Sequence, residues 1–137
     1  RAFGPEADDP RIAADLADTD VLLASAPPGE AGDPVLARYG DAIAASRIGW
    51  IGYLSTTGVY GDTDGEWVDE TSAIRSDVPR SQRRIKAEKG WLSLDADHSV
   101  PVHVFRLAGI YGPGRNALRA ATVQGKTAVP EAASLLR

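Results

Sequence analysis

The chain has 137 residues with a formal net charge of −4, 43% hydrophobic residues and 25% charged residues, a composition typical of one modest globular domain. The acidic balance argues against a general nucleic-acid surface or a surface for acidic membranes. There is no cysteine and there are only two histidines, which excludes disulfides and thiolate metal sites, and we expect no bound metal.

The apolar pattern predicts helices that alternate with strands. In chain order the expected elements are a helix over 10–17, a strand over 20–25, a helix over 35–47, a strand over 49–54, a long acidic loop over 61–79, a helix over 80–94, a strand over 101–107 and a helix from Asn116 toward Gln124. The first two strands are compact apolar runs, so we expect them to be buried. The alternation predicts right-handed crossovers and a parallel sheet in an α/β fold.

Several side chains within these elements carry specific expectations. Arg106 lies inside a predicted strand, so it needs a carboxylate or carbonyl partner if it is buried, and Glu88 is the candidate. Trp91 is expected in the core, and Trp50 is expected to pack against a helix. Trp67 lies in the acidic loop, where it is the best candidate for an exposed aromatic ring over a substrate or a partner.

Two of the predicted strands end in small, polar and glycine residues. These segments are YLSTTGVYGD over residues 53–62 and RLAGIYGPG over residues 106–114. Because ligands of an open α/β sheet bind beyond the carboxyl ends of its strands, the two segments predict two walls of one nucleotide or sugar pocket. A glycine-rich phosphate loop is missing, since Gly109, Gly112 and Gly114 follow a late strand and lack the Gly-x-Gly-x-x-Gly spacing.

These two segments, with Val68-Asp69-Glu70 and Ala87-Glu88 between them, closely resemble the extended short-chain dehydrogenase/reductase superfamily and, more narrowly, its NAD-dependent epimerase/dehydratase group. The resemblance covers roughly residues 18–118. It implies a Rossmann-type doubly wound parallel sheet, here an incomplete one that starts near the family's third strand and lacks the N-terminal glycine-rich segment. We therefore expect a partial NAD(P)-binding domain over 1–118, followed over 119–137 by a tail or the start of a substrate-binding subdomain.

The resemblance also implies which residues contact the ligands. Thr56 falls at the family's catalytic Ser/Thr position, where its hydroxyl would bond a substrate oxygen. The substrate side would further include Thr57, Tyr60 and Arg115. Of these, we interpret Tyr60 mainly as a packing residue. The implied cofactor contacts are Ser25, Ala26 and Pro27 beside the nicotinamide ribose, together with Ser55, Arg84, Ala108, Gly109 and Ile110.

The chain departs from the family at the catalytic Tyr-x-x-x-Lys pair. Counting back from Ala87-Glu88, the tyrosine position falls on Arg80 and the lysine position on Arg84. The family tyrosine acts as a general acid/base because a nearby lysine and the cofactor lower its pKa, whereas arginine cannot release a proton near neutral pH. Arg80 therefore cannot replace the tyrosine, while Arg84 could hold a ribose hydroxyl or a phosphate. These losses resemble the atypical members of the superfamily.

The resemblance thus implies an atypical NAD- or NADP-dependent protein whose ancestral reaction is hydride transfer at a carbon of a nucleotide-sugar. Its partners would be the nicotinamide dinucleotide, a small-molecule substrate and a second copy of the chain in a homodimer. We expect no nucleic acid and no membrane among its partners. Two alternatives stay open: a non-catalytic dinucleotide-binding or sensing module, and a partner-binding protein that uses Trp67. No apolar run approaches the roughly 20 residues of a membrane span, and the N-terminal residues resemble no signal peptide, so we expect a cytoplasmic protein.

Overall fold

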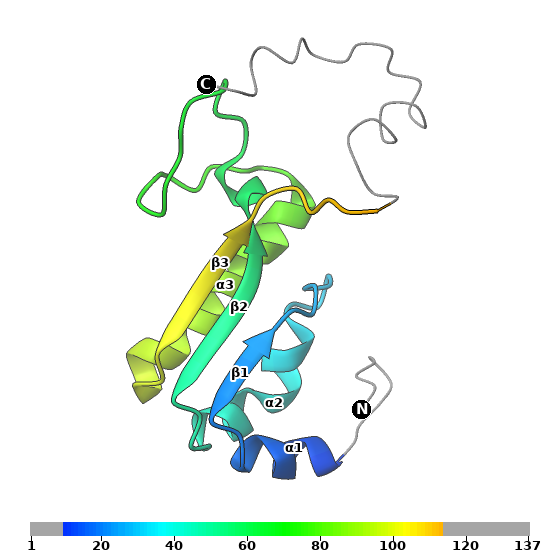
Figure 1. Ribbon diagram of the computed structural model, residues 1–137, viewed down its shortest axis with the longest axis vertical. Coiled ribbons are helices and arrows are strands. Elements are labelled where there is room, and N and C mark those ends of the chain that lie inside the picture. Colours follow the sequence, from blue (N-terminus) through cyan, green and yellow to red (C-terminus); the bar gives the residue numbers. More distant parts are fainter. Residues whose placement is uncertain (1–9, 114–137) are drawn as a thin grey trace.

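The computed structural model describes residues 10–113, which form a three-stranded parallel sheet with helices packed against it (Figure 1). The strands are β1 (Val21–Ala24), β2 (Trp50–Thr56) and β3 (Val102–Leu107), in the spatial order β1-β2-β3. The helices are α1 (Pro10–Ala17) before β1, α2 (Pro34–Ala44) between β1 and β2, and α3 (Pro79–His98) between β2 and β3. A short 3-10 helix, η1 (Thr57–Tyr60), follows β2. The predicted α/β fold with a parallel sheet is confirmed.

The register of the sheet brings the ends of the strands to one edge. Val21 pairs with Trp50 at the start of β1, and Thr56 at the end of β2 pairs with Leu107 at the end of β3. All three strands run in the same direction (Figure 1). The residues that follow them therefore gather at the carboxyl edge, which is the edge where ligands of this architecture bind.

The hydrophobic core lies between the sheet and the helices α2 and α3. Ile51 and Tyr53 of β2, Ile43 of α2 and Trp91 of α3 belong to one buried cluster and are all fully buried. The rings of Tyr53 and Trp91 stack with their centroids 5.7 Å apart, a separation at which aromatic pairs add to the stabilisation from burial. Trp91 thus occupies the core, as predicted.

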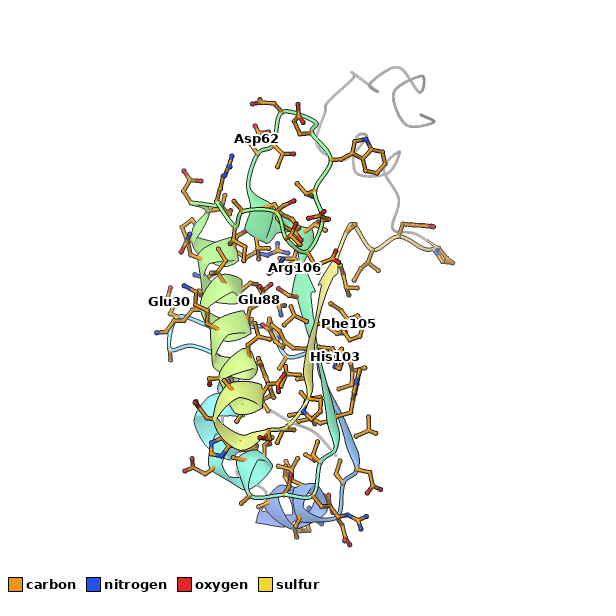
Figure 2. The ribbon with its side chains drawn as sticks, turned by 90° about the vertical axis from the view of Figure 1, so that its left-hand side faces the viewer. Glu30, Asp62, Glu88, His103, Phe105 and Arg106 are labelled. Carbon is orange, nitrogen blue, oxygen red and sulfur yellow. The ribbon has the colours of Figure 1, made fainter. Side chains whose placement is uncertain are left out.

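The opposite face of the sheet carries exposed apolar side chains. Because side chains alternate along a strand, Val21 and Leu23 point away from the core and are 61% and 58% exposed. Figure 2 shows His103 and Phe105 on the side of β3 that is turned away from α3. The strand over 20–25 was expected to be buried, but within residues 10–113 only one of its faces is covered.

Trp50 belongs to this exposed face, which corrects the expectation that it packs against a helix. Its ring stacks on His103 with the centroids 5.4 Å apart and is tilted against Phe105 at 6.1 Å. The ring also lies over Gly52, where an added Cβ would come within 2.6 Å of the indole. Trp50 therefore covers the backbone of its own strand.

The boundaries of α2 and α3 follow local capping signals. The Asp33 carboxylate accepts hydrogen bonds from the backbone amides of Val35 at 2.9 Å and Leu36 at 3.0 Å, so it caps the start of α2, and Pro34 occupies the first helical position. The other Asp33 oxygen accepts a bond from Trp91 Nε1 at 3.1 Å, which ties the start of α2 to α3. Helix α3 is longer than predicted and ends at His98, before Ser99 with a left-handed φ of 57°.

Candidate functional site

The carboxyl ends of the strands and the first two turns of α3 enclose a cavity of about 400 Å³, which we call the strand-end cavity. Two apolar residues of its lining, Leu54 and Leu107, were not predicted, although each precedes a segment that was. The predicted site residues that line it are Ser25, Ser55, Thr56, Thr57, Arg80, Arg84, Ala108, Gly109 and Ile110. Residues from distant parts of the chain thus meet here, as the sequence pattern predicts.

The remaining predicted site residues lie elsewhere. Ala26 and Pro27 line a neighbouring hollow of about 710 Å³ at the turn between β1 and α2. Tyr60 lines a third hollow of about 370 Å³ together with Thr57 and Arg106. Arg115 lies outside the described residues. Since Ser25 and Thr57 each border two hollows, the three lie next to one another along the carboxyl edge.

Arg84 is held against β2 at the wall of the strand-end cavity. Its Nη1 donates to the Leu54 carbonyl oxygen at 2.8 Å and to the Tyr53 hydroxyl oxygen at 3.1 Å. Its guanidinium carbon also lies 5.7 Å from the centre of the Tyr53 ring, within the range of a cation–π contact. These contacts orient the guanidinium, and the sequence alone could not reveal Tyr53 as its partner.

Thr56 ends β2 and begins η1. Its Oγ1 accepts a hydrogen bond from the backbone amide of Gly58 at 3.1 Å, so Thr56 caps this short helix. The hydroxyl hydrogen of Thr56 has no acceptor within the part of the chain that the structure describes. The Thr56 hydroxyl oxygen therefore accepts the capping hydrogen bond, while its O–H can still donate a hydrogen bond to an oxygen of a ligand.

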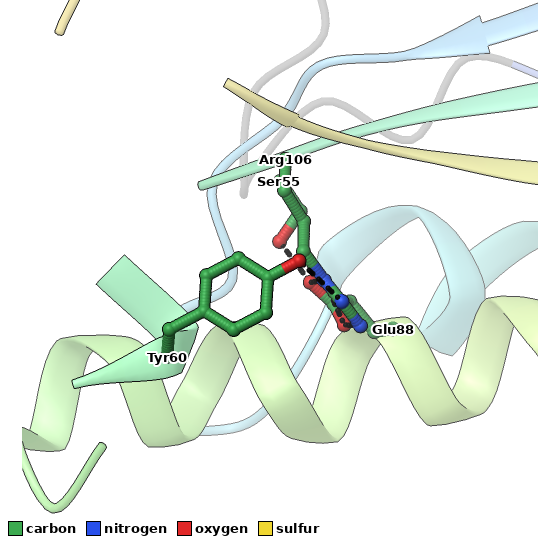
Figure 3. A network of polar contacts seen from close by, with 4 residues as sticks. All are labelled: Ser55, Tyr60, Glu88 and Arg106. Atoms are coloured by element: carbon green, nitrogen blue, oxygen red, sulfur yellow. Dashed lines mark hydrogen bonds and ion pairs between the residues drawn. The ribbon is translucent and has the colours of Figure 1, made fainter. Parts of the chain in front are cut away.

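A buried polar network lies beside the strand-end cavity (Figure 3). The Ser55 hydroxyl donates to Glu88 Oε1 at 2.5 Å, and Arg106 Nη2 pairs with Glu88 Oε2 at 2.9 Å. Arg106 Nη1 donates to the Tyr60 hydroxyl oxygen at 2.9 Å. Glu88 is 2% exposed, and its hydrogen bonds raise the pKa of Arg106 above its ordinary value. The predicted pairing of Arg106 with Glu88 is confirmed, and the network joins β2, η1, α3 and β3.

Proton-transfer groups are missing from the lining of the strand-end cavity, within residues 10–113. The side chains there are hydroxyls, guanidinium groups and apolar groups, without histidine, tyrosine, lysine or a carboxylate. Tyr53 touches Arg84, but it is fully buried, and burial raises its pKa above 10.0 against the lowering effect of Arg84. Tyr53 is therefore a poor proton donor for a ligand, because it neither reaches the cavity nor ionises readily.

The turn between β1 and α2 lacks the features of a phosphate cradle. The amides at the start of α2 that could face an anion are taken by the Asp33 carboxylate, whose negative charge would also repel a phosphate. Gly29 and Gly32 have open space where a Cβ would stand, so close packing does not require glycine at either position. The neighbouring hollow therefore offers room without a preformed site for a pyrophosphate.

Two further structural findings bear on the function. Within residues 10–113, no helix is both long enough and apolar enough to cross a membrane. In the same residues, no group of three or more histidine, cysteine, aspartate or glutamate side chains is placed to hold a metal ion.

Comparison of the sequence with curated proteins finds similarity to Protein YeeZ from two strains of Escherichia coli. No family model matches the chain. The chain is 35% identical over 122 residues to Protein YeeZ of Escherichia coli (strain K12), a match that covers 82% of this chain and 41% of YeeZ. The chain therefore spans less than half the length of the curated relatives that it matches.

Comparison with solved structures identifies the architecture. A functionally unknown conserved protein from Silicibacter pomeroyi DSS is 53% identical, with a TM-score of 0.64 over 70% of this chain and 34% of that protein. The UDP-glucuronic acid 4-epimerase from Bacillus cereus, solved in complex with NAD, is 18% identical, with a TM-score of 0.63 over 80% of this chain and 38% of the epimerase. A provisionally assigned NAD-dependent epimerase/dehydratase from Methylobacillus flagellatus is 25% identical, with a TM-score of 0.61 over 88% of this chain and 45% of that protein. The sheet of this chain is thus part of a Rossmann-type fold, as predicted.

Proposed function

We propose that the chain supplies the nicotinamide and substrate side of an atypical NAD- or NADP-binding protein related to the epimerase/dehydratases, with a nucleotide-sugar as its substrate class. One observation carries this proposal. The strand-end cavity gathers the hydroxyl of Thr56, the guanidinium of Arg84 and the segment 108–110 at the carboxyl edge of a parallel sheet. That edge is where this architecture holds its ligands, and the named solved relatives include an epimerase in complex with NAD.

The described residues fit one end of a nicotinamide dinucleotide. Arg84 would hold a ribose hydroxyl or a phosphate, the segment 108–110 would lie along the nicotinamide ring, and Thr56, beside that ring, would bond a substrate oxygen. When bound, the cofactor would supply hydride transfer. The pyrophosphate end has no cradle within residues 10–113, because Asp33 occupies the start of α2. The predicted division into a partial domain over 1–118 and a tail over 119–137 remains part of this proposal.

The proposal is tested by measuring binding of NAD and NADP to the full protein by calorimetry, with Thr56→Ala as the variant and Glu66→Gln, an exposed change in the acidic loop, as the control. We expect saturable binding that Thr56→Ala weakens and Glu66→Gln leaves unchanged. If neither dinucleotide binds to a folded sample, the cofactor assignment is wrong.

A second candidate is a dinucleotide-binding module without turnover. It is favoured by the absence of a proton-transfer side chain in the described lining of the strand-end cavity, since the hydride chemistry of the family needs a partner that moves a proton. The two candidates differ in one measurement. Absorbance at 340 nm with nucleotide-sugars present reports turnover with release of reduced cofactor, and product analysis reports epimerisation. Binding without either signal would favour the module.

A further inference from the structure

Two arginines of α3 line the strand-end cavity: Arg80 is exposed, whereas Arg84 is bonded to β2. Arg80 and Arg84 are four residues apart, so they lie on the same face of the helix, and both line the cavity. Arg80 is exposed and has no hydrogen bond or ion pair with any described residue. By contrast, Arg106 is paired with Glu88. No side chain in the described part of the chain therefore compensates the charge of Arg80 where the strands end.

Arg84 is fixed in place with part of its hydrogen-bonding capacity unused. Its Nη1 is bonded to Leu54 and Tyr53, while its Nε and Nη2 have no acceptor within the described part of the chain. A guanidinium presents its donors in a rigid planar fork that matches the two oxygens of a carboxylate or a phosphate. Arg84 is thus oriented by β2 in advance and keeps donors for a ligand.

Among residues 10–113, no carboxylate lines the strand-end cavity to offset these two charges. Its described lining contains no aspartate or glutamate. Glu88 lies behind the wall, and both of its oxygens are bonded, to Ser55 and to Arg106. Asp69 and Glu70 border the separate hollow that contains Tyr60. The positive end of the α3 dipole adds to the same potential, because Arg80 lies in the first turn of that helix.

We propose that the strand-end cavity binds an oxyanion group of the small-molecule ligand, a carboxylate or a phosphate, held by Arg80 and by the free donors of Arg84. The hydroxyl of Thr56 is the third donor, since its hydrogen has no described acceptor. This inference rests on the proposed function, because it names the chemistry of the ligand at that same site. At positions 80 and 84, arginine would recognise a negative charge where the family's tyrosine and lysine transfer a proton. The two side chains would hold the ligand by an acidic group of the ligand itself.

The test is a titration of the full protein with inorganic phosphate and, separately, with acetate, at an ionic strength kept constant with chloride. Amide and arginine Nε–H signals are followed by nuclear magnetic resonance. We expect saturable shifts at Thr56, Thr57 and residues 108–110 with at least one of the two anions. The anion that binds more tightly identifies the group as phosphate or carboxylate.

Three variants make the assignment specific. Arg80→Ala should weaken anion binding by about tenfold, the loss expected for one charge-assisted hydrogen bond. Arg84→Lys, which keeps the charge and loses the fork, should weaken it less. Lys86→Ala removes one positive charge from α3 at an exposed position outside the cavity lining, and it should change affinity by less than about twofold, since exposed charges are screened by salt.

Two outcomes would overturn the inference: the absence of saturable shifts with both anions, or an equal loss of affinity in Arg80→Ala and Lys86→Ala. Because Arg84 also binds the backbone of β2, its variant could fail to fold, and Arg80→Ala then decides alone. Dinucleotide binding is measured on the same samples. If NAD or NADP binds while neither anion does, the inference of an oxyanion site fails and the proposed function stands. If an anion binds while neither dinucleotide does, the oxyanion site stands and the proposed function fails.

Discussion

Replacing Glu88 with glutamine should destabilise the protein strongly. The side chain is 2% exposed, it accepts hydrogen bonds from Ser55 and Arg106, and the Arg106 side chain is 17% exposed. Removing one partner of a buried ion pair costs about 3–5 kcal/mol. Because Arg106 keeps some solvent contact and its bond to Tyr60, we expect the lower end, about 3 kcal/mol.

Urea unfolding followed by tryptophan fluorescence measures this loss. With an m-value of about 2 kcal/mol per molar urea, the midpoint should fall by about 1.5 M. Glu70→Gln, at an exposed position, is the control and should leave the midpoint unchanged. The double variant Glu88→Gln/Arg106→Gln should recover part of the loss, with a coupling energy of about 2 kcal/mol. A loss below about 0.5 kcal/mol in Glu88→Gln, with no coupling, would refute the reasoning.

Three smaller predictions concern β2 and the loop that follows it. Thr56→Ala should cost about 1 kcal/mol of unfolding free energy by removing the cap on the Gly58 amide, and Thr56→Ser should restore it; equal losses in both variants would contradict the capping role. The raised pKa of Tyr53 means that its contribution to stability is complete below about pH 10 and is lost as the pH rises through the folded-state pKa. Urea midpoints should therefore fall more steeply at alkaline pH in the wild type than in Tyr53→Phe, and parallel profiles would exclude this linkage. Gly61→Ala should cost about 1–3 kcal/mol by thermal unfolding, because Gly61 has a φ of 78° and an added Cβ would lie 3.2 Å from the Ser76 backbone, whereas a neutral result would mean that the loop shifts freely.

Local chemistry made much of this structure predictable. The spacing of Ile12 and Leu16 predicts α1 with the bounds that the structure has. The partner of Arg106 follows from a simple requirement: a charged side chain inside a strand needs an opposite charge nearby, and Glu88 lies on the preceding helix. The start of α2 was predicted one residue late, although Asp33 followed by Pro34 is a capping signal that the sequence contains.

Other features depend on contacts that no local pattern encodes. The run from Val21 to Leu23 is apolar on both of its faces, which predicts a strand that is covered on both sides. Whether a second layer covers the strand depends on other parts of the protein, which the run itself does not encode. The position of Trp50 is of the same kind, because its contacts with His103 and Phe105 depend on the pairing of β2 with β3. The bond between Arg84 and Tyr53 joins residues that are far apart in the sequence, and it exists only because α3 crosses back over β2.

The order of pairing in the sheet also has a consequence for how the chain folds. The contact of Val21 with Trp50 closes a much shorter loop than the contact of Ile51 with Val102, and loop-closure entropy favours the shorter one by about 0.5 kcal/mol. Until β3 arrives, α3 docked on β2 would leave the Glu88 carboxylate buried without its cation. Docking of α3 and addition of β3 should therefore occur as one late cooperative step, and in native-state hydrogen exchange the amides of these two elements should open together.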